Sequence, residues 1–441
     1  MRSMTKTLVS QVAAALEANG LQKSAKITVG LSGGVDSVVL LHLLRRGLRL
    51  PPKRLSAIHV NHQISAHAAS WATHCRRFCR ELGVSLKVAK VDVPRGNSTE
   101  AAARHARHAV FASTAANVVA LAHNRDDQAE TLLLQLLRGA GPRGLAAMPV
   151  FRSGIPAFWR PLLDVPRSEI ESYALHHGLT WVEDDSNLDR GYLRNFLRHD
   201  VLPLIAARLP AADVVLARAA RLQAEASDLL DALALHDLGD AEFSRFIPLN
   251  ILNNIPEHRA RNVMRYFLRN SGVAMPDAAR LEEALRQALT ARSDARVCVD
   301  IGDVELRRFR DALHIVRPLP AVVADFKVEW SHRAPLVLPE LGGTLSLRSC
   351  KGSGIADQWL RAHALTVRVR RGGETLRLLA GGPRRTVRNL LQEVLLAPWR
   401  RERLPIIYLG DKLAAVPGVG VDEQFQAAAG RRGWMPVWEP D

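Results

Sequence analysis

The stretch that decides the fold runs from Ala25 to Arg46 and reads AKITVGLSGGVDSVVLLHLLRR. Its first part, Ala25 to Leu31, is a short run of apolar and β-branched residues, which predicts a buried strand. Its last part, Val35 to Arg46, is apolar nearly all round and is followed by Gly47, which predicts a buried helix. The residues between them therefore form a turn from a strand into a helix, and the two glycines there let the backbone turn tightly.

This strand–turn–helix unit predicts a cradle for a pyrophosphate group. The hydroxyls of Ser32 and Ser37 can donate to phosphate oxygens, and the start of the helix adds free N–H groups and the positive end of its dipole. Asp36 is unusual beside phosphates unless it holds a cation, so we interpret it as a Mg²⁺ ligand. The turn matches neither G-x-x-x-x-G-K-S/T nor G-x-G-x-x-G, so neither a Walker ATPase nor a dinucleotide enzyme is indicated. The residues predicted to contact the ligand are Ser32, Gly33, Gly34, Val35, Asp36 and Ser37.

Strand-like and helix-like segments continue to alternate over residues 1–200. Further strands are predicted over Leu55–Val60, Ser85–Val91 and Asn117–Ala122, helices over Ala69–Leu82, Thr99–Ala116 and Asp126–Leu137, and loops over Gly141–Pro166. Such alternation predicts an α/β fold with a doubly wound, mostly parallel sheet that helices cover on both faces. Ligands of such sheets bind beyond the carboxyl ends of the strands, where the turn after Leu31 would lie.

A chain of 441 residues exceeds the roughly 250–300 that one core usually holds, so we expect more than one domain. The composition changes near Pro203–Pro210, and Pro318–Pro339 has the proline content of a linker. We predict a ligand-binding catalytic domain over residues 1–205, a smaller helical and α+β domain over 211–317 and a smaller α+β domain over 340–441. In the last we expect a hairpin that turns at Gly372-Gly373 and a single helix over Thr386–Trp399.

The charge balance points to a polyanionic partner. Lys and Arg number 60 against 44 Asp and Glu, which gives a net charge of +16. Nucleic acid is the first candidate, although a GC-rich genome would also raise the arginine content. No window of about 18 apolar residues predicts a membrane span. The N-terminal stretch lacks the pattern of a signal peptide, so we expect a cytoplasmic protein with no membrane partner.

The turn SGGVDS resembles the signature of the PP-loop ATP pyrophosphatases, which adenylate a carbonyl oxygen and release pyrophosphate. Further segments narrow this resemblance. They are His59–His62 (HVNH), Glu100–Arg104 (EAAAR), Ala122–Thr131 (AHNRDDQAET), Arg138–Leu145 (RGAGPRGL), Arg160–Leu163 (RPLL), Glu183–Asn187 (EDDSN), Arg194-Asn195 and Arg198. In this order the set resembles the tRNA(Ile)-lysidine synthetase family, closely from Ala25 to about Pro203 and again at Pro398-Trp399-Arg400. One departure is His108, where the family usually has tyrosine.

The resemblance implies an adenine nucleotide alpha hydrolase-like PP-loop domain followed by two tRNA-binding domains. It also implies a carbon–nitrogen ligase with ATP and Mg²⁺ as cofactors. ATP adenylates the C2 oxygen of the cytidine at the first anticodon position of the minor tRNA(Ile) with a CAU anticodon. The ε-amine of L-lysine then attacks C2 and AMP leaves. The product, lysidine, changes the codon and amino-acid specificity of the tRNA from Met to Ile. The oligomeric state stays open, a homodimer included.

An acidic cluster provides candidates for binding lysine. Asp126, Asp127 and Glu130 stand together in an otherwise basic chain, and Asp127 and Glu130 share a helix face. They could hold the ammonium group and remove its proton, because only the neutral amine is a nucleophile. The alternative is an ordinary helix N-terminus, where acidic residues are favourable. Which carboxylate would act as the base stays open.

The remaining candidates fall into two sets. Contacts to the nucleotide or substrate are predicted for His59, Asn61, His62, Arg104 and His123. Contacts to tRNA are predicted for Arg194, Arg198, Arg368, Arg370, Arg384, Arg385 and Arg400. The histidines could also form a metal triad, but no fourth ligand is evident.

Two rival functions follow from the same residues. A tRNA thiolase of the same superfamily would need catalytic thiols or an iron–sulfur cluster, and only Cys75 and Cys79 lie close together in the sequence. Their spacing of four on an amphipathic helix is also typical of buried, inert thiols. A non-catalytic RNA-binding protein would not require the intact SGGVDS turn or the acidic cluster.

Overall fold

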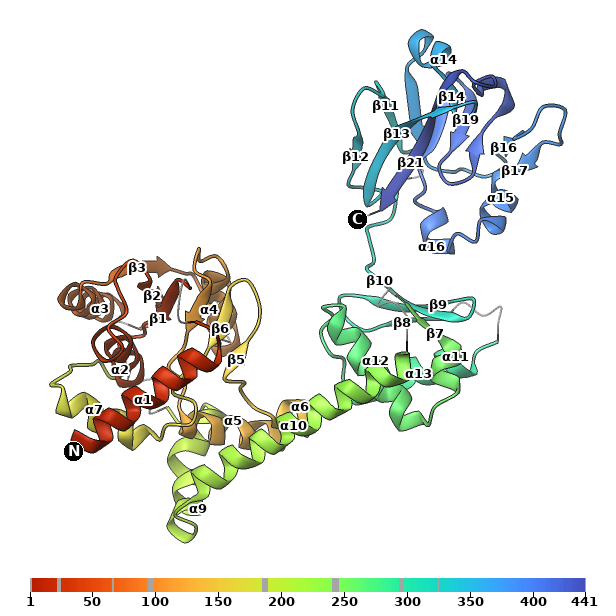
Figure 1. Ribbon diagram of the computed structural model, residues 1–441. Helices are drawn as coiled ribbons and strands as arrows, with labels where there is room; N and C mark the ends of the chain where they lie inside the picture. Colours follow the sequence, from red (N-terminus) through yellow and green to blue (C-terminus); the bar gives the residue numbers. More distant parts are fainter. Residues whose placement is uncertain are drawn as a thin grey trace. The chain divides into compact units, whose positions relative to one another are not determined.

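The computed structural model describes residues 2–21, 25–65, 67–93, 99–184, 189–239, 246–292, 297–323 and 325–440. The chain divides into two compact units, residues 1–233 and 234–441, and the boundary falls inside helix α10 (Ala212–Leu238) (Figure 1). The predicted segment Glu183–Asn187 lies partly outside the described residues. The three domain ranges that the sequence suggests stay a prediction.

The first unit contains a mixed sheet of the expected kind. Its strands lie in the order β3 (Ser85–Lys90), β2 (Leu55–Asn61), β1 (Ile27–Gly30), β4 (Val118–Ala120), β6 (Ala157–Trp159) and β5 (Phe151–Arg152). All neighbouring pairs are parallel except β5 and β6. The central strand β1 sets the register, because Ile27 lies opposite both Leu55 and Val118. The prediction of a mostly parallel sheet is confirmed.

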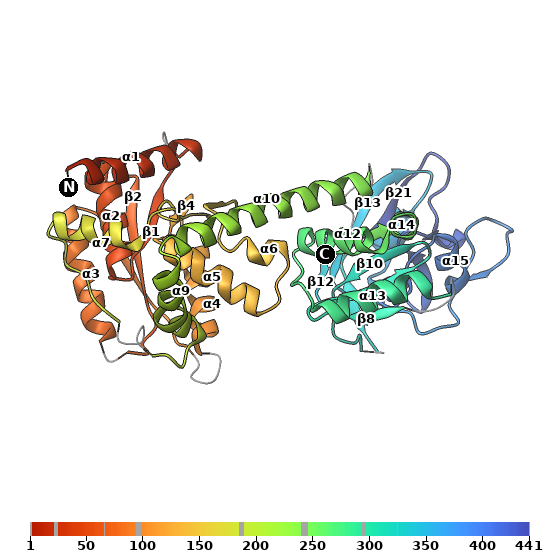
Figure 2. The same ribbon diagram turned by 90° about the horizontal axis from the view of Figure 1, so that it is seen from below.

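Helices cover both faces of this sheet. They are α1 (Arg2–Ala18), α2 (Val35–His42), α3 (Ala68–Leu82), α4 (Thr99–Ala112), α5 (Arg125–Leu137) and α7 (Arg167–His176). Two neighbouring residues of β2 pack into different hydrophobic cores. Ala57 belongs to the core that includes residues of α2 and α3, and Ile58 belongs to the core that includes Phe111 of α4. Figure 2 shows α2 and α3 on one side of β1 and β2, and α4 on the other. Because side chains alternate across a strand, both faces are buried and the fold is doubly wound.

One expectation for this unit is wrong. Gly141–Pro166, expected to be loops, contains helix α6 (Pro142–Leu145) and strands β5 and β6, which are too short to give a periodic pattern. The domain boundary expected at Pro203–Pro210 stays a prediction. Helix α9 (Leu202–Arg208) lies in this segment and follows α8 (Leu193–Phe196) and a π-helical turn over Leu197–Val201. Pro203 is tolerated there because it lies in the first turn, where its missing N–H costs no hydrogen bond.

The second unit begins with a helical layer against an antiparallel sheet. The helices are α11 (Leu249–Asn253), α12 (Glu257–Asn270) and α13 (Ala278–Thr290), and the strands are β7 (Phe246–Pro248), β8 (Cys298–Asp300), β9 (Glu305–Phe309) and β10 (Ala312–Val316). The sheet order is β7-β10-β9-β8. Asp277 caps α13 by accepting the N–H of Arg280 at 2.8 Å. The inward faces of α12 and α13 share one core with Leu306 and Leu313 of the sheet.

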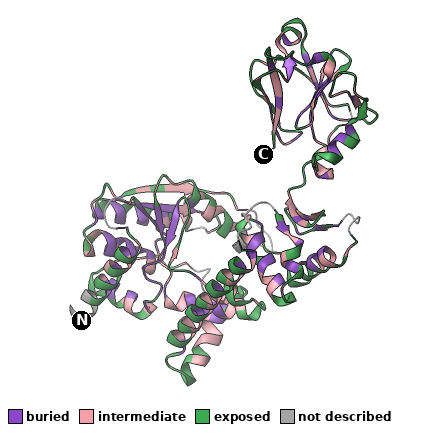
Figure 3. Ribbon diagram, turned by 45° about the vertical axis from the view of Figure 1, so that its right-hand side comes forward, coloured by how far each residue is buried: buried purple, intermediate pink, exposed green. Residues whose placement is uncertain are grey.

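The remainder of this unit is a β-rich domain. One sheet has the order β11 (Lys327–Trp330), β15 (Leu365–Arg368), β18 (Ile406–Leu409), β19 (Lys412–Val416) and β20 (Gly420–Val421). The other has the order β12 (Leu336–Leu338), β13 (Gly343–Lys351), β21 (Arg432–Pro440) and β14 (Ile355–Ala356). The smaller elements are α14 (Asp357–Ala362), β16 (Thr375–Leu376), β17 (Arg385–Thr386), α15 (Val387–Glu393), α16 (Pro398–Arg401) and a 3₁₀ turn over Glu423–Phe425. Figure 3 shows buried residues along the strands of both units.

Three expectations for this domain are corrected. Pro318–Pro339 is not only a linker, because β11 and β12 lie within it. β15 pairs with β11 and β18, so no hairpin forms with the strand after Gly372-Gly373. The single helix expected over Thr386–Trp399 is two, since Leu395 takes φ +59° and Pro398 starts a new helix. Proline disfavours a helical conformation in the residue before it. Among the described residues, no helix is long and apolar enough to cross a membrane.

Candidate active site

The turn between β1 and α2 has the geometry of an anion cradle. Gly33 has φ +97°, and a Cβ there would lie 2.8 Å from Cγ2 of Val182, so a side chain does not fit. The N–H groups of Gly33 and Gly34 donate to the hydroxyls of Ser37 and Ser32, each at 3.2 Å. The two hydroxyls lie 3.1 Å apart. The N–H groups and hydroxyls that the sequence predicts to contact phosphate therefore lie close together. In this structure the two hydroxyl oxygens accept the hydrogen bonds of the two N–H groups.

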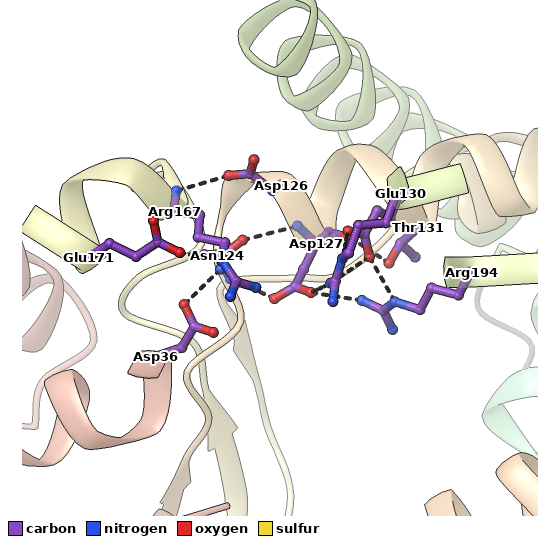
Figure 4. Close-up of polar contacts among 10 residues, drawn as sticks. Asp36, Asn124, Asp126, Asp127, Glu130, Thr131, Arg167, Glu171 and Arg194 are labelled. Carbon is purple, nitrogen blue, oxygen red and sulfur yellow. Dashed lines mark hydrogen bonds and ion pairs between the residues drawn. The ribbon is translucent and has the colours of Figure 1, made fainter. Parts of the chain in front are cut away.

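Asp36 lies in the first turn of α2, and its Oδ1 accepts a hydrogen bond from Nδ2 of Asn124 at 3.0 Å (Figure 4). Burial raises the pKa of the Asp36 carboxyl group, while the charge of Arg167 opposes this change. Within the described residues, no group of three His, Cys, Asp or Glu side chains could hold a metal ion. One carboxylate is a common protein contribution to a Mg²⁺ ion that substrate phosphates also bind, so Asp36 fits the predicted role.

Asn124 organises the start of α5. Its side chain accepts the N–H of Asp127 at 3.1 Å, and Oδ2 of Asp127 accepts the N–H of Asn124 at 3.0 Å, which forms a capping box. The third carboxylate of the predicted cluster points elsewhere, since Oδ2 of Asp126 accepts the N–H of Arg167 at the start of α7 at 2.9 Å. Asp126 therefore links α5 to α7, whereas Asp127 and Glu130 lie together.

Two arginines form ion pairs with Asp127 and Glu130, and Figure 4 labels one of them, Arg194. Arg194 donates through Nε to Glu130 and through Nη2 to Asp127, both at 2.9 Å. Arg198 donates through Nη2 to Glu130 at 2.9 Å and to Asp127 at 3.1 Å. The side chain of Glu130 is only 1% exposed. Burial opposes the ionisation of Asp127, but Arg194, His123, the Asn124 N–H and Arg198 together outweigh it and hold the pKa of that carboxyl group below its usual value. Arg194 and Arg198, expected to contact tRNA, thus neutralise the residues expected to bind lysine.

The predicted histidines differ in how they are held. Nδ1 of His59 lies 2.9 Å from the Leu31 carbonyl oxygen and 3.6 Å from Sγ of Cys75, so this ring is fixed between β1 and α3. The Nδ1 atoms of His62 and His123 are buried without a hydrogen-bond partner in the described part of the chain. Burial lowers the pKa of His123 to about 3 and also lowers that of His62. Both are neutral rings at pH 7 that carry an unused nitrogen.

Two further residues of this unit, Asn61 and Arg104, are predicted to contact the nucleotide or substrate. Asn61 is buried at the end of β2, where its Oδ1 accepts the N–H of Gln63 at 2.9 Å, so it stabilises the turn that follows. Arg104 is exposed on α4. His108, which departs from the family pattern, packs against the ring of Phe158 with centroids 5.6 Å apart. A histidine therefore fills the position of the usual aromatic residue.

Two residues of this region were not singled out from the sequence. Asn124 connects Asp36 to Asp127, and its place before two aspartates at a helix start is the signal that could have revealed it. Arg160 is only 6% exposed, and no carboxylate pairs with it in the described residues. Its Nη1 donates to the Pro149 carbonyl oxygen at 2.9 Å, and its Nε is unpartnered. Burial lowers the pKa of Arg160 to about 10, and the positive charges of Arg152 and Arg104 contribute to this decrease.

The arginines predicted to contact tRNA in the β-rich domain have different surroundings. The guanidinium of Arg368 lies 4.6 Å from the ring centroid of Tyr408, and Arg385 pairs with Glu393. Arg384 donates to Oγ1 of Thr375 at 3.3 Å, and Arg400 is exposed. Arg370 lines a cavity of this domain.

The alternative hypothesis of a tRNA thiolase would need reactive thiols, and Cys75 and Cys79 are poorly suited to that role. Cys75 and Cys79 are both buried in α3. Burial raises the pKa of each thiol to about 12, so neither is a thiolate near pH 7. The other two cysteines lie elsewhere, Cys298 in β8 and Cys350 in β13.

Comparison with known proteins agrees with this arrangement. Family models match a PP-loop domain over residues 4–205, a TilS substrate binding domain over 248–314 and a TilS substrate C-terminal domain over 365–438. A tRNA(Ile)-lysidine synthase of Nitrosomonas europaea is 40% identical over 423 residues, which cover 94% of this chain and 92% of the relative. One of Chromobacterium violaceum is 41% identical over 419 residues, which cover 93% and 95%.

Similar solved structures include a U34-tRNA thiolase from Methanococcus maripaludis, at 20% identity and a TM-score of 0.42 over 51% of this chain and 80% of that one. That score is too low to bear on function. The relatives match nearly the whole chain, the family models match its parts in order, and the PP-loop family implies the use of ATP. The chain belongs to the tRNA(Ile)-lysidine synthase family.

Proposed function

We propose that this protein ligates L-lysine to C2 of the first anticodon cytidine of tRNA(Ile) with a CAU anticodon, at the expense of ATP. The observation that carries the proposal is the direct connection between the phosphate turn and the acidic pair. Asn124 bonds to Asp36 on one side and to Asp127 on the other. A nucleotide on the turn and an amine at Asp127 and Glu130 would therefore lie within one site.

The first half-reaction requires the leaving pyrophosphate to be stabilised. The N–H groups of Gly33 and Gly34 can exchange their present hydroxyl acceptors for phosphate oxygens, which bear more negative charge. Asp36 would hold Mg²⁺, which when bound supplies positive charge to the departing phosphates. The unused Nδ1 atoms of His62 and His123 can accept hydrogen bonds from the exocyclic amine of a cytosine.

The second half-reaction requires a neutral lysine amine. Asp127 and Glu130 would receive the ammonium group, and one of them would take its proton before the amine attacks C2. Arg194 and Arg198 pair with both carboxylates until then and fix their orientation. When lysine enters, at least one of these guanidiniums must give up its hydrogen bonds, because the oxygens it now occupies are those that the ammonium needs.

The rest of the chain would bind the tRNA, and the net charge of +16 supports this role. The central residues 211–317 and the arginine-rich residues 340–441 are the predicted binding domains. A cytoplasmic location remains part of the proposal, since tRNA is modified there. The proposal leaves the number of subunits open.

The experiment is incorporation of radiolabelled lysine into a tRNA(Ile) transcript with a CAU anticodon, with and without ATP. We expect labelling that requires ATP and that a transcript with a changed first anticodon base abolishes. Glu130→Gln should reduce labelling at least 100-fold, whereas the matched change Glu171→Gln, at an exposed ion pair with Arg167, should leave it unchanged. A folded protein that does not label the CAU transcript, or that adds sulfur to it, would overturn the proposal.

A further inference from the structure

Arg160 is a buried cation that lacks a counter-ion among the described residues. It follows β6, and only 6% of the residue is exposed. Nη1 donates to the Pro149 carbonyl oxygen at 2.9 Å, but Nε is buried without a hydrogen-bond partner. Removing a charge from water is costly unless an ion of opposite charge compensates for it. The described part of the chain supplies no such ion, so the position suits an anionic group of a ligand.

Arg160 lies at the carboxyl end of the sheet, on the face that α4 covers. Phe158 of β6 packs in the core that includes Phe111 of α4, and side chains alternate along a strand, so Arg160 belongs to the same face. Burial lowers the pKa of His123, which follows β4; the charge of Asp127 opposes this decrease and that of Arg160 adds to it. Both charges therefore act on one ring, at the edge of the sheet where ligands of parallel folds bind.

Short contacts also connect Arg160 to the acidic pair. Gln128, the residue after Asp127 in α5, donates to the Met148 carbonyl oxygen at 2.7 Å and accepts the Met148 N–H at 2.9 Å. Pro149 is the next residue, and its carbonyl oxygen accepts the hydrogen bond of Arg160. Two adjacent residues thus hold the helix of the acidic pair and the buried guanidinium in one local framework.

Among the proposed substrates, lysine has an anion that matches this position. The phosphates of ATP are assigned to the turn after β1, and β4 separates β1 from β6 in the sheet. Free lysine carries a cation at the end of its side chain and an anion at its α-carbon. The site has two carboxylates at the start of α5 and, beside them, a cation that no carboxylate of the described residues pairs with.

We propose that Arg160 binds the α-carboxylate of the lysine substrate while Asp127 and Glu130 receive its ε-ammonium group. A guanidinium can donate to both oxygens of a carboxylate, and Nε is one of the donors suited to this pairing. The charges of Arg104 and Arg152, which repel that of Arg160, make an entering anion still more favourable. This inference rests on the proposed lysine ligation and adds the contact that distinguishes lysine from a simple diamine.

The first test uses the parent protein and compares lysine with cadaverine, the diamine that lacks only the α-carboxylate. The parent should prefer lysine at least about 100-fold in kcat/KM, because cadaverine leaves the buried guanidinium unpaired. Equal kcat/KM values would overturn the inference, although the proposed ligation would stand. If the parent incorporates neither amine, the proposed ligation fails and this inference fails with it.

The second test replaces the guanidinium. Arg160→Gln should raise KM for lysine at least about 30-fold, yet change kcat/KM for cadaverine less than about threefold. Arg160→Lys keeps the positive charge and should prefer lysine more strongly than Arg160→Gln does. The control is Arg152→Gln, which removes an exposed guanidinium that lies 4.6 Å from the ring centroid of Phe158, and it should keep KM for lysine within about twofold.

The two amines separate substrate binding from a structural role. Circular dichroism checks that each variant is folded. If Arg160→Gln lowers the incorporation of lysine and of cadaverine equally, Arg160 only supports the fold and the inference is wrong. It is also wrong if the variant raises KM for tRNA but not for lysine, because the guanidinium would then contact the RNA.

Discussion

The side-chain amide of Asn124 donates to the carboxylate of Asp36 across 88 residues of sequence, at 3.0 Å. This bond joins the start of α2 to the start of α5, and Asn124 also caps α5 through Asp127. The two carboxylates proposed for different half-reactions, Asp36 for the cation and Asp127 for lysine, are thus positioned by one amide.

The variants Asn124→Asp and Asn124→Ala should separate these two functions of the amide. Aspartate also caps helices well, so Asn124→Asp keeps the cap of α5, but it buries a carboxylate beside Asp36 and should lower stability for that reason. Asn124→Ala should cost about 1 kcal/mol through the lost cap. Both should reduce pyrophosphate release, Asn124→Asp the more strongly, because it places a second carboxylate beside Asp36. Thermal unfolding and a pyrophosphate assay measure the two effects. An Asn124→Asp variant with parental activity would show that the bond to Asp36 has no role.

Asp36→Ala should abolish ATP-dependent pyrophosphate release and leave tRNA binding within about twofold. The carboxylate lies at the phosphate turn, and the arginines of the β-rich domain that are predicted to contact tRNA lie in the other unit of the chain. Pyrophosphate release with and without tRNA, together with filter binding, tests this expectation. Normal turnover of the variant would rule out Asp36 as the cation ligand.

Arg194→Gln should shift the acid side of the pH profile upward. Arg194 holds the pKa of Asp127 below its usual value. The ionised carboxylate therefore stabilises the fold above the unfolded pKa near ~3.9, and this contribution is lost as the pH falls through the lower folded pKa. Without the guanidinium the folded pKa rises, so lysine ligation and stability should both fail at a higher pH than in the parent.

The measurement for this variant is kcat/KM for lysine from about pH 5 to 9 at saturating ATP and tRNA. Arg190→Gln is the control, because it breaks the exposed ion pair with Asp200, at 2.8 Å, in the same part of the chain. Its profile should match that of the parent. An unshifted profile for Arg194→Gln would show that the ionisation of Asp127 does not limit the reaction.

Replacing Cys75 and Cys79 together with alanine should leave lysine ligation within about an order of magnitude. Both thiols are buried in α3, and truncating them should cost about 1–2 kcal/mol as two small cavities. The nucleophile of the proposed reaction is the substrate amine, so no thiol takes part. Complete loss of activity in a variant with a native circular dichroism spectrum would favour sulfur transfer instead.

Removing residues 318–441 should weaken tRNA binding far more than ATP binding. The predicted range of this domain begins at residue 340, but β11 and β12 precede that point and share the core of the β-rich domain, so the truncation should begin before them. If the domain neutralises about six phosphates, the intact protein should show a log–log salt slope near −5, and the truncated protein a much shallower one. An unchanged slope would place the tRNA contacts elsewhere.

Local sequence patterns predicted the first unit well and the β-rich domain poorly. The strand, turn and helix around the SGGVDS turn can be predicted because each element has its own periodicity and the glycines mark the turn. The pairing of β15 with β11 and β18 cannot, because short strands carry no signal of their partners. The break at Leu395 and Pro398 did have a local signal in the proline itself, which the apolar pattern of the flanking helices obscured.

The candidate site also has features that the sequence predicts and features that only the folded chain shows. The spacing of Asp127 and Glu130 predicts that they share a helix face, and they do. Their pairing with Arg194 depends on residues 64 or more positions away, so only the folded chain reveals it. The sequence predicted that Arg194 and Arg198 contact RNA and that Asp127 and Glu130 bind lysine. In the structure these two arginines form ion pairs with these two carboxylates.

The closed cluster of two arginines and two carboxylates also couples ligands of opposite charge. An anion that draws Arg194 or Arg198 away leaves oxygens of Asp127 and Glu130 free for a cation, and a cation bound there frees a guanidinium for an anion. Each ligand thereby removes part of the cost of binding the other. Thermodynamic reciprocity requires the two effects to be equal, so a polyanion that raises the affinity for an amine tenfold must itself bind tenfold more tightly when the amine is present.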